Sequence, residues 1–133
     1  MKKISILLLL ALVCSCSKSD DSSSSSKSDF HPPAWIQGNW GQESSISVGV
    51  LFSFSENDFC MTNMGIAKQC QQESVDLYRK YGNAVTVTET ITSTTYTAEI
   101  KYLGGQSVIY SFRKLSNNSI EWTAVAGSVL IKQ

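Results

Sequence analysis

The chain has 133 residues, with eleven basic and eleven acidic side chains and a single histidine, so its formal net charge at pH 7 is zero. No basic stripe stands out from this balance, which excludes the electrostatic surface that nucleic-acid binding requires. A chain of this length forms one small domain around one hydrophobic core.

Residues 1–15 have the pattern of a secretory signal peptide. Lys2 and Lys3 precede an apolar run over residues 4–13, which is too short to span a bilayer as a stable helix. Ser15 and Cys16 follow, an ending that resembles the bacterial lipobox, in which the cysteine is lipidated and becomes the mature N-terminus. We therefore expect Cys16 to anchor the protein to a membrane. An uncleaved anchor and a plain signal peptide with incidental cysteines are the alternatives.

Residues 16–31 have the composition of a disordered tether, which would leave 32–133 as the folded domain. Only serine, lysine and aspartate occur from residue 17 to residue 29, and they bury too little apolar surface to offset the entropy of ordering. The run Ser-Lys-Ser-Asp-Asp at 17–21 resembles the signal that sends lipoproteins of Bacteroides-like bacteria to the cell surface. The resemblance implies an outer-membrane lipoprotein exposed on the cell.

From residue 37 onward, apolar side chains mostly alternate with polar ones, which is typical of half-buried strands. Phe52 and Phe54, for example, alternate with serines, and Gly104-Gly105 has the composition of a hairpin turn. The pattern predicts eight strands, at residues 37–43, 46–55, 59–63, 85–92, 96–102, 108–112, 120–124 and 129–132.

The alternation breaks at residues 66–81, where the spacing predicts one helix. Ile66, Cys70, Leu77 and Tyr81 would share its apolar face. A glycine–asparagine pair follows, and these residue types commonly end helices.

Eight short antiparallel strands predict an up-and-down β-barrel, because closing the sheet removes its exposed edges. A two-sheet β-sandwich is the alternative, since periodicity does not reveal closure. A barrel of eight strands either fills with side chains or holds one small ligand.

Two cysteines lie inside the predicted domain. With Cys16 lipidated, Cys60 and Cys70 form an even pair, and an oxidising compartment favours a disulfide between them. Two buried free thiols are the alternative. We expect no metal site, because no second cysteine pair or histidine cluster accompanies them.

Gly38-Asn39-Trp40 resembles the Gly-x-Trp motif in the first strand of lipocalin-like domains. Residues 33–133 are similar in layout to small bacterial lipocalin-like (calycin-type) lipoproteins of the Bacteroides kind. The resemblance implies a barrel floor at which Gly38 lets the backbone bend and the Trp40 indole acts as a plug. The chain departs from lipocalins in its shorter length and in the helix between its third and fourth strands.

Catalytic chemistry finds little support in the sequence. His31 is the only histidine and adjoins the tether, so neither a Ser-His-Asp arrangement within the fold nor a histidine zinc site is expected. No glycine-rich phosphate loop occurs either. We therefore predict a protein that is not an enzyme and needs no cofactor.

If the barrel is hollow, aromatic side chains of its inner face would line a ligand pocket, although such residues more commonly fill a core. Glu89 continues the inward face of its strand and would orient a ligand there, unless it lies at the rim. The candidate binding residues are Glu89, Tyr96, Tyr102, Tyr110, Phe112 and Trp122.

These features together predict an envelope lipoprotein that binds a small hydrophobic ligand without catalysis. The alternative is a protein-binding module, such as an inhibitor of a wall-degrading enzyme or a subunit of a surface complex. An internal cavity would favour the ligand carrier, and a filled interior with an exposed apolar patch would favour protein binding.

Overall fold

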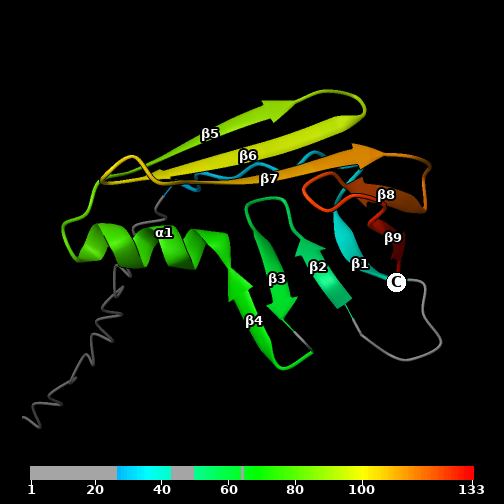
Figure 1. Cartoon of the computed structure of the whole chain (residues 1–133), viewed down its shortest axis with the longest axis horizontal. Coiled ribbons are helices and arrows are strands. Elements are labelled where there is room, and N and C mark those ends of the chain that lie inside the picture. Colours follow the sequence, from blue (N-terminus) through cyan, green and yellow to red (C-terminus); the bar gives the residue numbers. More distant parts are fainter. Residues whose placement is uncertain (1–26, 43–49, 64) are drawn as a thin grey trace, which may run out of the picture.

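The computed structural model describes residues 27–42, 50–63 and 65–133. In these residues, nine antiparallel strands form one sheet and a single helix accompanies it, which confirms the predicted mainly β architecture (Figure 1). The elements are β1 (Gly38–Gln42), β2 (Val50–Phe54), β3 (Phe59–Asn63), β4 (Ala67–Cys70), α1 (Gln71–Lys80), β5 (Val85–Ile91), β6 (Thr95–Tyr102), β7 (Ser107–Lys114), β8 (Ser119–Trp122) and β9 (Val129–Lys132).

The sheet curls into a half-barrel and does not close on itself. Its strand order is β4-β3-β2-β1-β9-β8-β7-β6-β5, so β4 and β5 are the two edges. Helix α1 joins these edges along the chain and contacts β3, β4 and β5, so it covers the open side of the sheet. One continuous sheet is not a two-sheet sandwich, and the predicted closed barrel of eight strands is matched only roughly.

The first and last strands, β1 and β9, pair directly in the middle of the sheet. Trp40 lies opposite Lys132 in an antiparallel register between β1 and β9. The Trp40 indole is fully buried, and its Nε1–H donates to the Ile36 carbonyl at 2.6 Å. Gly38 has a φ of +122°, and a Cβ there would lie 3.0 Å from Cε of Lys132. The positive φ favours glycine at this bend, whereas the flexible Lys132 side chain could shift to make room for a Cβ.

The helix begins at Gln71 and not at residue 66, which corrects the predicted boundary. Residues 67–70 form β4 instead, an added strand that pairs with β3 after a turn containing Gly65. Cys60 and Cys70 lie opposite each other in this pair and form a disulfide. A cross-link that closes a loop this short contributes about 2–3 kcal/mol to stability by restricting the unfolded chain.

The buried face of α1 also differs from the predicted face. Gln71 and Val75 are buried, whereas Leu77 is 50 % exposed and Tyr81 is 74 % exposed. The point at which the helix starts determines which face is buried. The Asp58 side chain, from the turn before β3, accepts the Gln72 N–H at 2.9 Å and so caps the first turn of the helix. Burial raises the pKa of Asp58, although backbone N–H groups of the helix oppose that shift.

The interior of the half-barrel is filled with aromatic side chains. Rings from opposite sides of the curled sheet meet edge to face, with Phe52 and Phe112 at 5.0 Å between centroids and Phe59 and Tyr110 also at 5.0 Å. The fully buried large side chains are Phe30, Ile36, Trp40, Phe52, Phe59, Gln71, Val75, Tyr96, Ile100, Phe112, Ile120 and Leu130. The alternative of a filled interior is therefore the one that this structure shows.

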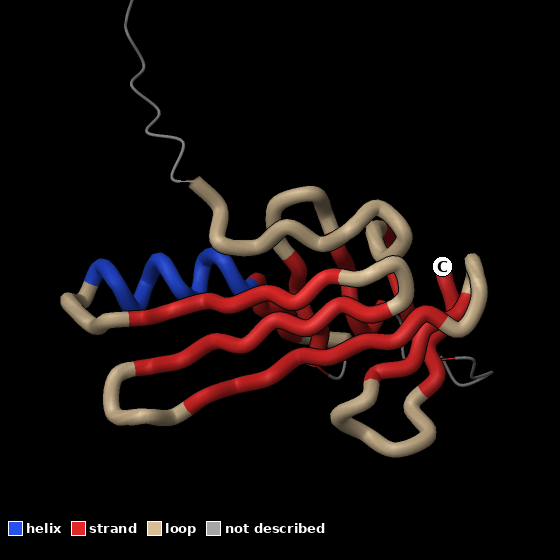
Figure 2. Tube along the Cα trace, turned by 90° about the horizontal axis from the view of Figure 1, so that it is seen from above, coloured by secondary structure: helices blue, strands red, loops and turns tan. Residues whose placement is uncertain are grey.

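The N-terminal strap, residues 28–36, packs against the domain before β1 begins (Figure 2). Phe30 is fully buried, with its ring 5.4 Å from that of Phe59. Asp29 pairs with Arg79 of α1 at 2.6 Å. The hydrogen bonds from Arg79 are the main reason that the pKa of Asp29 lies below its usual value. The last four residues of the predicted tether thus belong to the folded domain, because one aromatic side chain among polar residues is enough to anchor them.

The predicted signal peptide, Cys16, most of the tether and residues 43–49 lie outside the described residues. The last residue of the first predicted strand and the start of the second fall in the range 43–49. None of the helices in the described part of the chain is long and apolar enough to cross a membrane.

Candidate binding groove

Most of the predicted ligand residues help to fill the core. Tyr96 and Phe112 are fully buried, and Tyr110 packs its ring against Phe59. Trp122 is half-buried, with its ring 5.1 Å from that of Phe52. The rings of these four residues pack against the other aromatic rings of the core. Side chains therefore occupy the space that a hollow barrel would offer a ligand.

Glu89 binds the N-terminal strap and does not face a cavity. Its Oε1 accepts the His31 backbone N–H at 2.8 Å and the Tyr96 hydroxyl at 2.7 Å, and its Oε2 lies 3.0 Å from His31 Nδ1. Burial and then the hydrogen bond to Glu89 raise the pKa of Tyr96, so its hydroxyl keeps the proton that it donates. The carboxylate therefore fastens residue 31 to β5 at the rim of the half-barrel.

An imidazole beside a carboxylate forms part of the arrangement that activates a nucleophile in hydrolases. Sequence reasoning missed this pair, because His31 precedes Glu89 by 58 residues and adjoins the tether. Within the described residues, no serine or threonine hydroxyl forms a hydrogen bond with the other ring nitrogen of His31. In the part of the chain that the structure describes, the pair holds the strap to the sheet.

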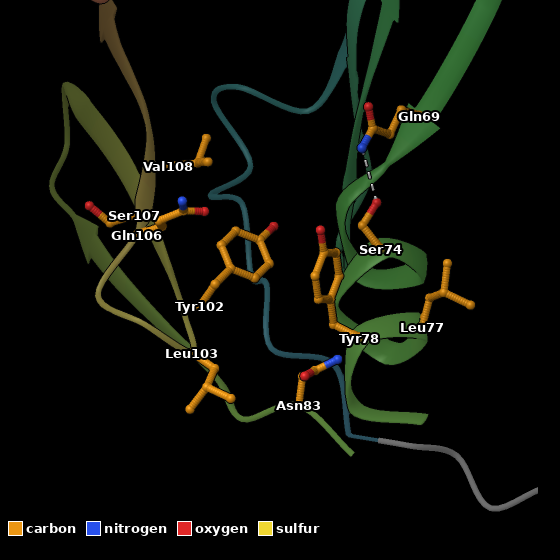
Figure 3. Close-up of a pocket in the computed structure, with 10 residues that line it drawn as sticks. All are labelled: Gln69, Ser74, Leu77, Tyr78, Asn83, Tyr102, Leu103, Gln106, Ser107 and Val108. Carbon is orange, nitrogen blue, oxygen red and sulfur yellow. Dashed lines mark hydrogen bonds between the residues drawn. The ribbon is translucent and has the colours of Figure 1, made fainter. Parts of the chain in front are cut away.

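An open groove of about 700 Å³ lies between α1 and the hairpin that joins β6 to β7 (Figure 3). We call it the α1–hairpin groove. Tyr102 and Val108 contribute to it because they continue the inward faces of β6 and β7 beyond the packed core. Its lining residues are Gln69, Ser74, Leu77, Tyr78, Asn83, Tyr102, Leu103, Gln106, Ser107 and Val108.

Two tyrosines, one from each wall of the groove, pack against each other. The rings of Tyr78 on α1 and Tyr102 on β6 lie 4.7 Å apart and are tilted by 48°. Burial is the main cause that raises the pKa of Tyr102, and Tyr78 adds to the shift. At one end of the groove, Gln69 donates from Nε2 to the Ser74 hydroxyl at 3.3 Å. Aromatic faces and neutral polar groups therefore line the same open space.

Of the six predicted ligand residues, Tyr102 is the one that lines this groove. Tyr78 is not among the residues of the predicted apolar helix face, and Asn83 and Gln106 fall in turns. Alternation along strands gives no information about turns or about the face that a short helix presents. The groove has no such sequence signal, because it depends on how α1 lies beside the β6–β7 turn.

Asp58, Cys60 and Cys70 place possible metal-ligating atoms within 4.8 Å of one another. The two sulfur atoms are bonded to each other, so they are not available as thiolate ligands. This cluster in the described residues is a capped helix start beside a disulfide and does not have the donor set of a metal site.

The chain matches no protein-family model, no curated protein and no solved structure.

Proposed function

We propose that this protein is a lipid-anchored, non-catalytic binding protein of the outer membrane, exposed on the cell surface, and that its small ligand occupies the α1–hairpin groove. The lipobox-like ending at Cys16 and the serine-rich segment after it support the anchor. The observation that carries the binding role is the open groove of about 700 Å³, a volume within the range of small-molecule sites.

The fold is best described as a lipocalin-like barrel that has been opened on one side. Pairing of β1 with β9 and the buried Trp40 of Gly38-Asn39-Trp40 support this relation. The filled interior argues against binding at the place where a hollow barrel would hold a ligand. The proposed site is therefore displaced to the end of the half-barrel, next to the helix.

Binding of a protein partner is the second candidate, and the filled interior with exposed apolar side chains favours it; the open groove is the observation that places the small ligand first. Leu77 of α1 and Tyr81, which directly follows the helix, are half or more exposed, and Leu103 in the neighbouring hairpin is 68 % exposed. Exposed apolar side chains that gather in one region are typical of interaction surfaces. A protein partner would cover the outer face of α1, whereas a small ligand would lie between α1 and the hairpin.

Native mass spectrometry of the protein purified from its own envelope tests the proposal. Val108→Trp places a large side chain in the groove, and Ile109→Trp is its matched control on the opposite face of β7. We expect a co-purifying small molecule on the wild type and on Ile109→Trp, and its loss from Val108→Trp. A molecule that stays bound to folded Val108→Trp, or a wild type that carries only a protein partner, would overturn the proposal.

A further inference from the structure

We infer that the ligand of the α1–hairpin groove is an uncharged oligosaccharide, an assignment that rests on the groove being the binding site. The first observation is electrostatic, since none of the ten lining residues carries a charge. A phosphate, sulfate or carboxylate group would find no lysine or arginine in the lining to pair with it. The groove therefore selects a neutral ligand.

The second observation is the number of neutral hydrogen-bonding groups. Gln69, Asn83 and Gln106 offer side-chain amides and Ser107 offers a hydroxyl, whereas the Ser74 hydroxyl already donates to the Cys70 carbonyl and accepts from Gln69. An amide both donates and accepts hydrogen bonds, so several amides around one groove match a ligand with many hydroxyl groups. An acyl chain would remove these groups from water without replacing their hydrogen bonds, which costs free energy.

The third observation is the aromatic wall. Tyr78 is 46 % exposed, and Tyr102 reaches the same opening from the opposite side. The face of an aromatic ring carries negative charge density, which attracts the slightly positive C–H groups on the flat face of a sugar ring. Because the two tyrosine rings already contact each other, a sugar ring would lie over their exposed surfaces and not between them.

The openness of the groove fits a chain of sugar units better than a single enclosed unit. Its walls come from the helix on one side and a strand hairpin on the other, so the ligand can extend past Asn83 or past Val108. Many weak contacts along such a groove add up to a measurable affinity, although each one is modest.

The test uses the full chain in lipid nanodiscs and isothermal titration calorimetry with defined hexasaccharides. Neutral probes are cellohexaose, mannohexaose and maltohexaose, and a hexamer of galacturonic acid is the charged probe. We expect binding of at least one neutral probe and none of the charged probe. Tyr102→Ala should weaken the affinity about tenfold, the equivalent of 1.4 kcal/mol, and Gln106→Ala should also weaken it.

Two further variants separate binding from folding. Tyr102→Phe keeps the ring and should retain most of the affinity, and Ile109→Ala removes an exposed side chain on the opposite face of β7 and should change nothing. Failure of all three neutral probes to bind, or unchanged affinity in both Tyr102→Ala and Gln106→Ala, would overturn the assignment. If the molecule found on the native protein is a lipid or an acid that Val108→Trp displaces, the groove is right and the oligosaccharide is wrong.

Discussion

At the scale of single residues, the Gly38-Asn39-Trp40 motif connects the bend of the first strand to the pairing of the first strand with the last. The Trp40 indole is buried and bonded to the Ile36 carbonyl, and the Lys132 ammonium lies 5.5 Å from its ring centroid. A cation over an indole face is attracted by the negative charge density of the ring. One side chain thus joins the strap, the first strand and the last strand.

Trp40→Ala should lower the free energy of unfolding by about 3–5 kcal/mol, because it removes a large buried side chain and leaves a cavity. Chemical denaturation measures this change. Trp35→Ala is the matched control, since Trp35 is only half-buried and should cost clearly less. Equal losses in the two variants would show that Trp40 does not have the central place described here.

Asp29→Asn should destabilise the protein at neutral pH by about 1 kcal/mol or less, because the ion pair with Arg79 is partly exposed. Arg79 keeps the pKa of Asp29 below its model-peptide value of 3.8. A carboxyl group with a lowered pKa stabilises the fold above about pH 4, and this contribution disappears as the pH falls through the folded-state pKa.

Denaturation curves between pH 7 and pH 2 check this dependence. The difference between wild type and Asp29→Asn should be constant above about pH 5 and should shrink below pH 4. Glu56→Gln, in an exposed turn, is the control and should show little difference across the range. A difference that grows toward low pH would contradict the assigned role of Asp29.

At the scale of elements, α1 and the N-terminal strap together cover the side that the sheet leaves open. The helix packs against both edges, and the strap is fastened to α1 through Asp29 and to β5 through Glu89. The residues of β4 stay largely exposed, so these contacts link the two edges of the sheet without burying them. The half-barrel is therefore closed by contacts between side chains and not by a further strand pair.

Phe30→Ala should lower the free energy of unfolding by about 3–4 kcal/mol, since Phe30 is fully buried in the aromatic core. If residues 16–31 were all tether, the same substitution would have no effect. Ser28→Ala is the comparison within the strap, because it removes hydrogen bonds at the partly exposed start of the segment. A Phe30→Ala protein as stable as the wild type would contradict the placement of Phe30 in the folded core.

The strands were largely predictable from sequence because alternation such as that of Phe52 and Phe54 directly reflects burial on one face of a sheet. β4 was not, because its sequence Ala-Lys-Gln-Cys carries no such alternation and is placed by the disulfide and the turn before it. The helix face was misread because a polar residue, Gln71, takes a buried position. The groove could not be predicted, since it depends on how the helix sits beside the β6–β7 turn.

At the scale of the whole molecule, the proposed anchor and the proposed site lie at different points of the chain. Cys16 precedes the strap by about a dozen residues, and the strap contacts α1, one wall of the groove. The aromatic core separates the groove from the floor at Trp40. This arrangement gives one filled domain with the proposed binding site at one end.

Cys16→Ser should release the protein from the membrane. If lipidation of Cys16 holds the wild type there, fractionation of cells should find the wild type with membranes and the variant in the soluble fraction. Cys14→Ser is the control, because Val13 before Cys14 fits the lipobox poorly. Membrane association of processed Cys16→Ser would contradict the anchor.

A crystal structure of the protein isolated from its own envelope tests the central claim most directly, namely that the half-barrel is filled and that binding occurs at the α1–hairpin groove. The account predicts ligand density along α1 and the β6–β7 hairpin, in contact with Tyr78 and Tyr102, while Phe52 and Phe112 stay packed together. Ligand density between the rings of Phe52 and Phe112, inside the half-barrel, would contradict it.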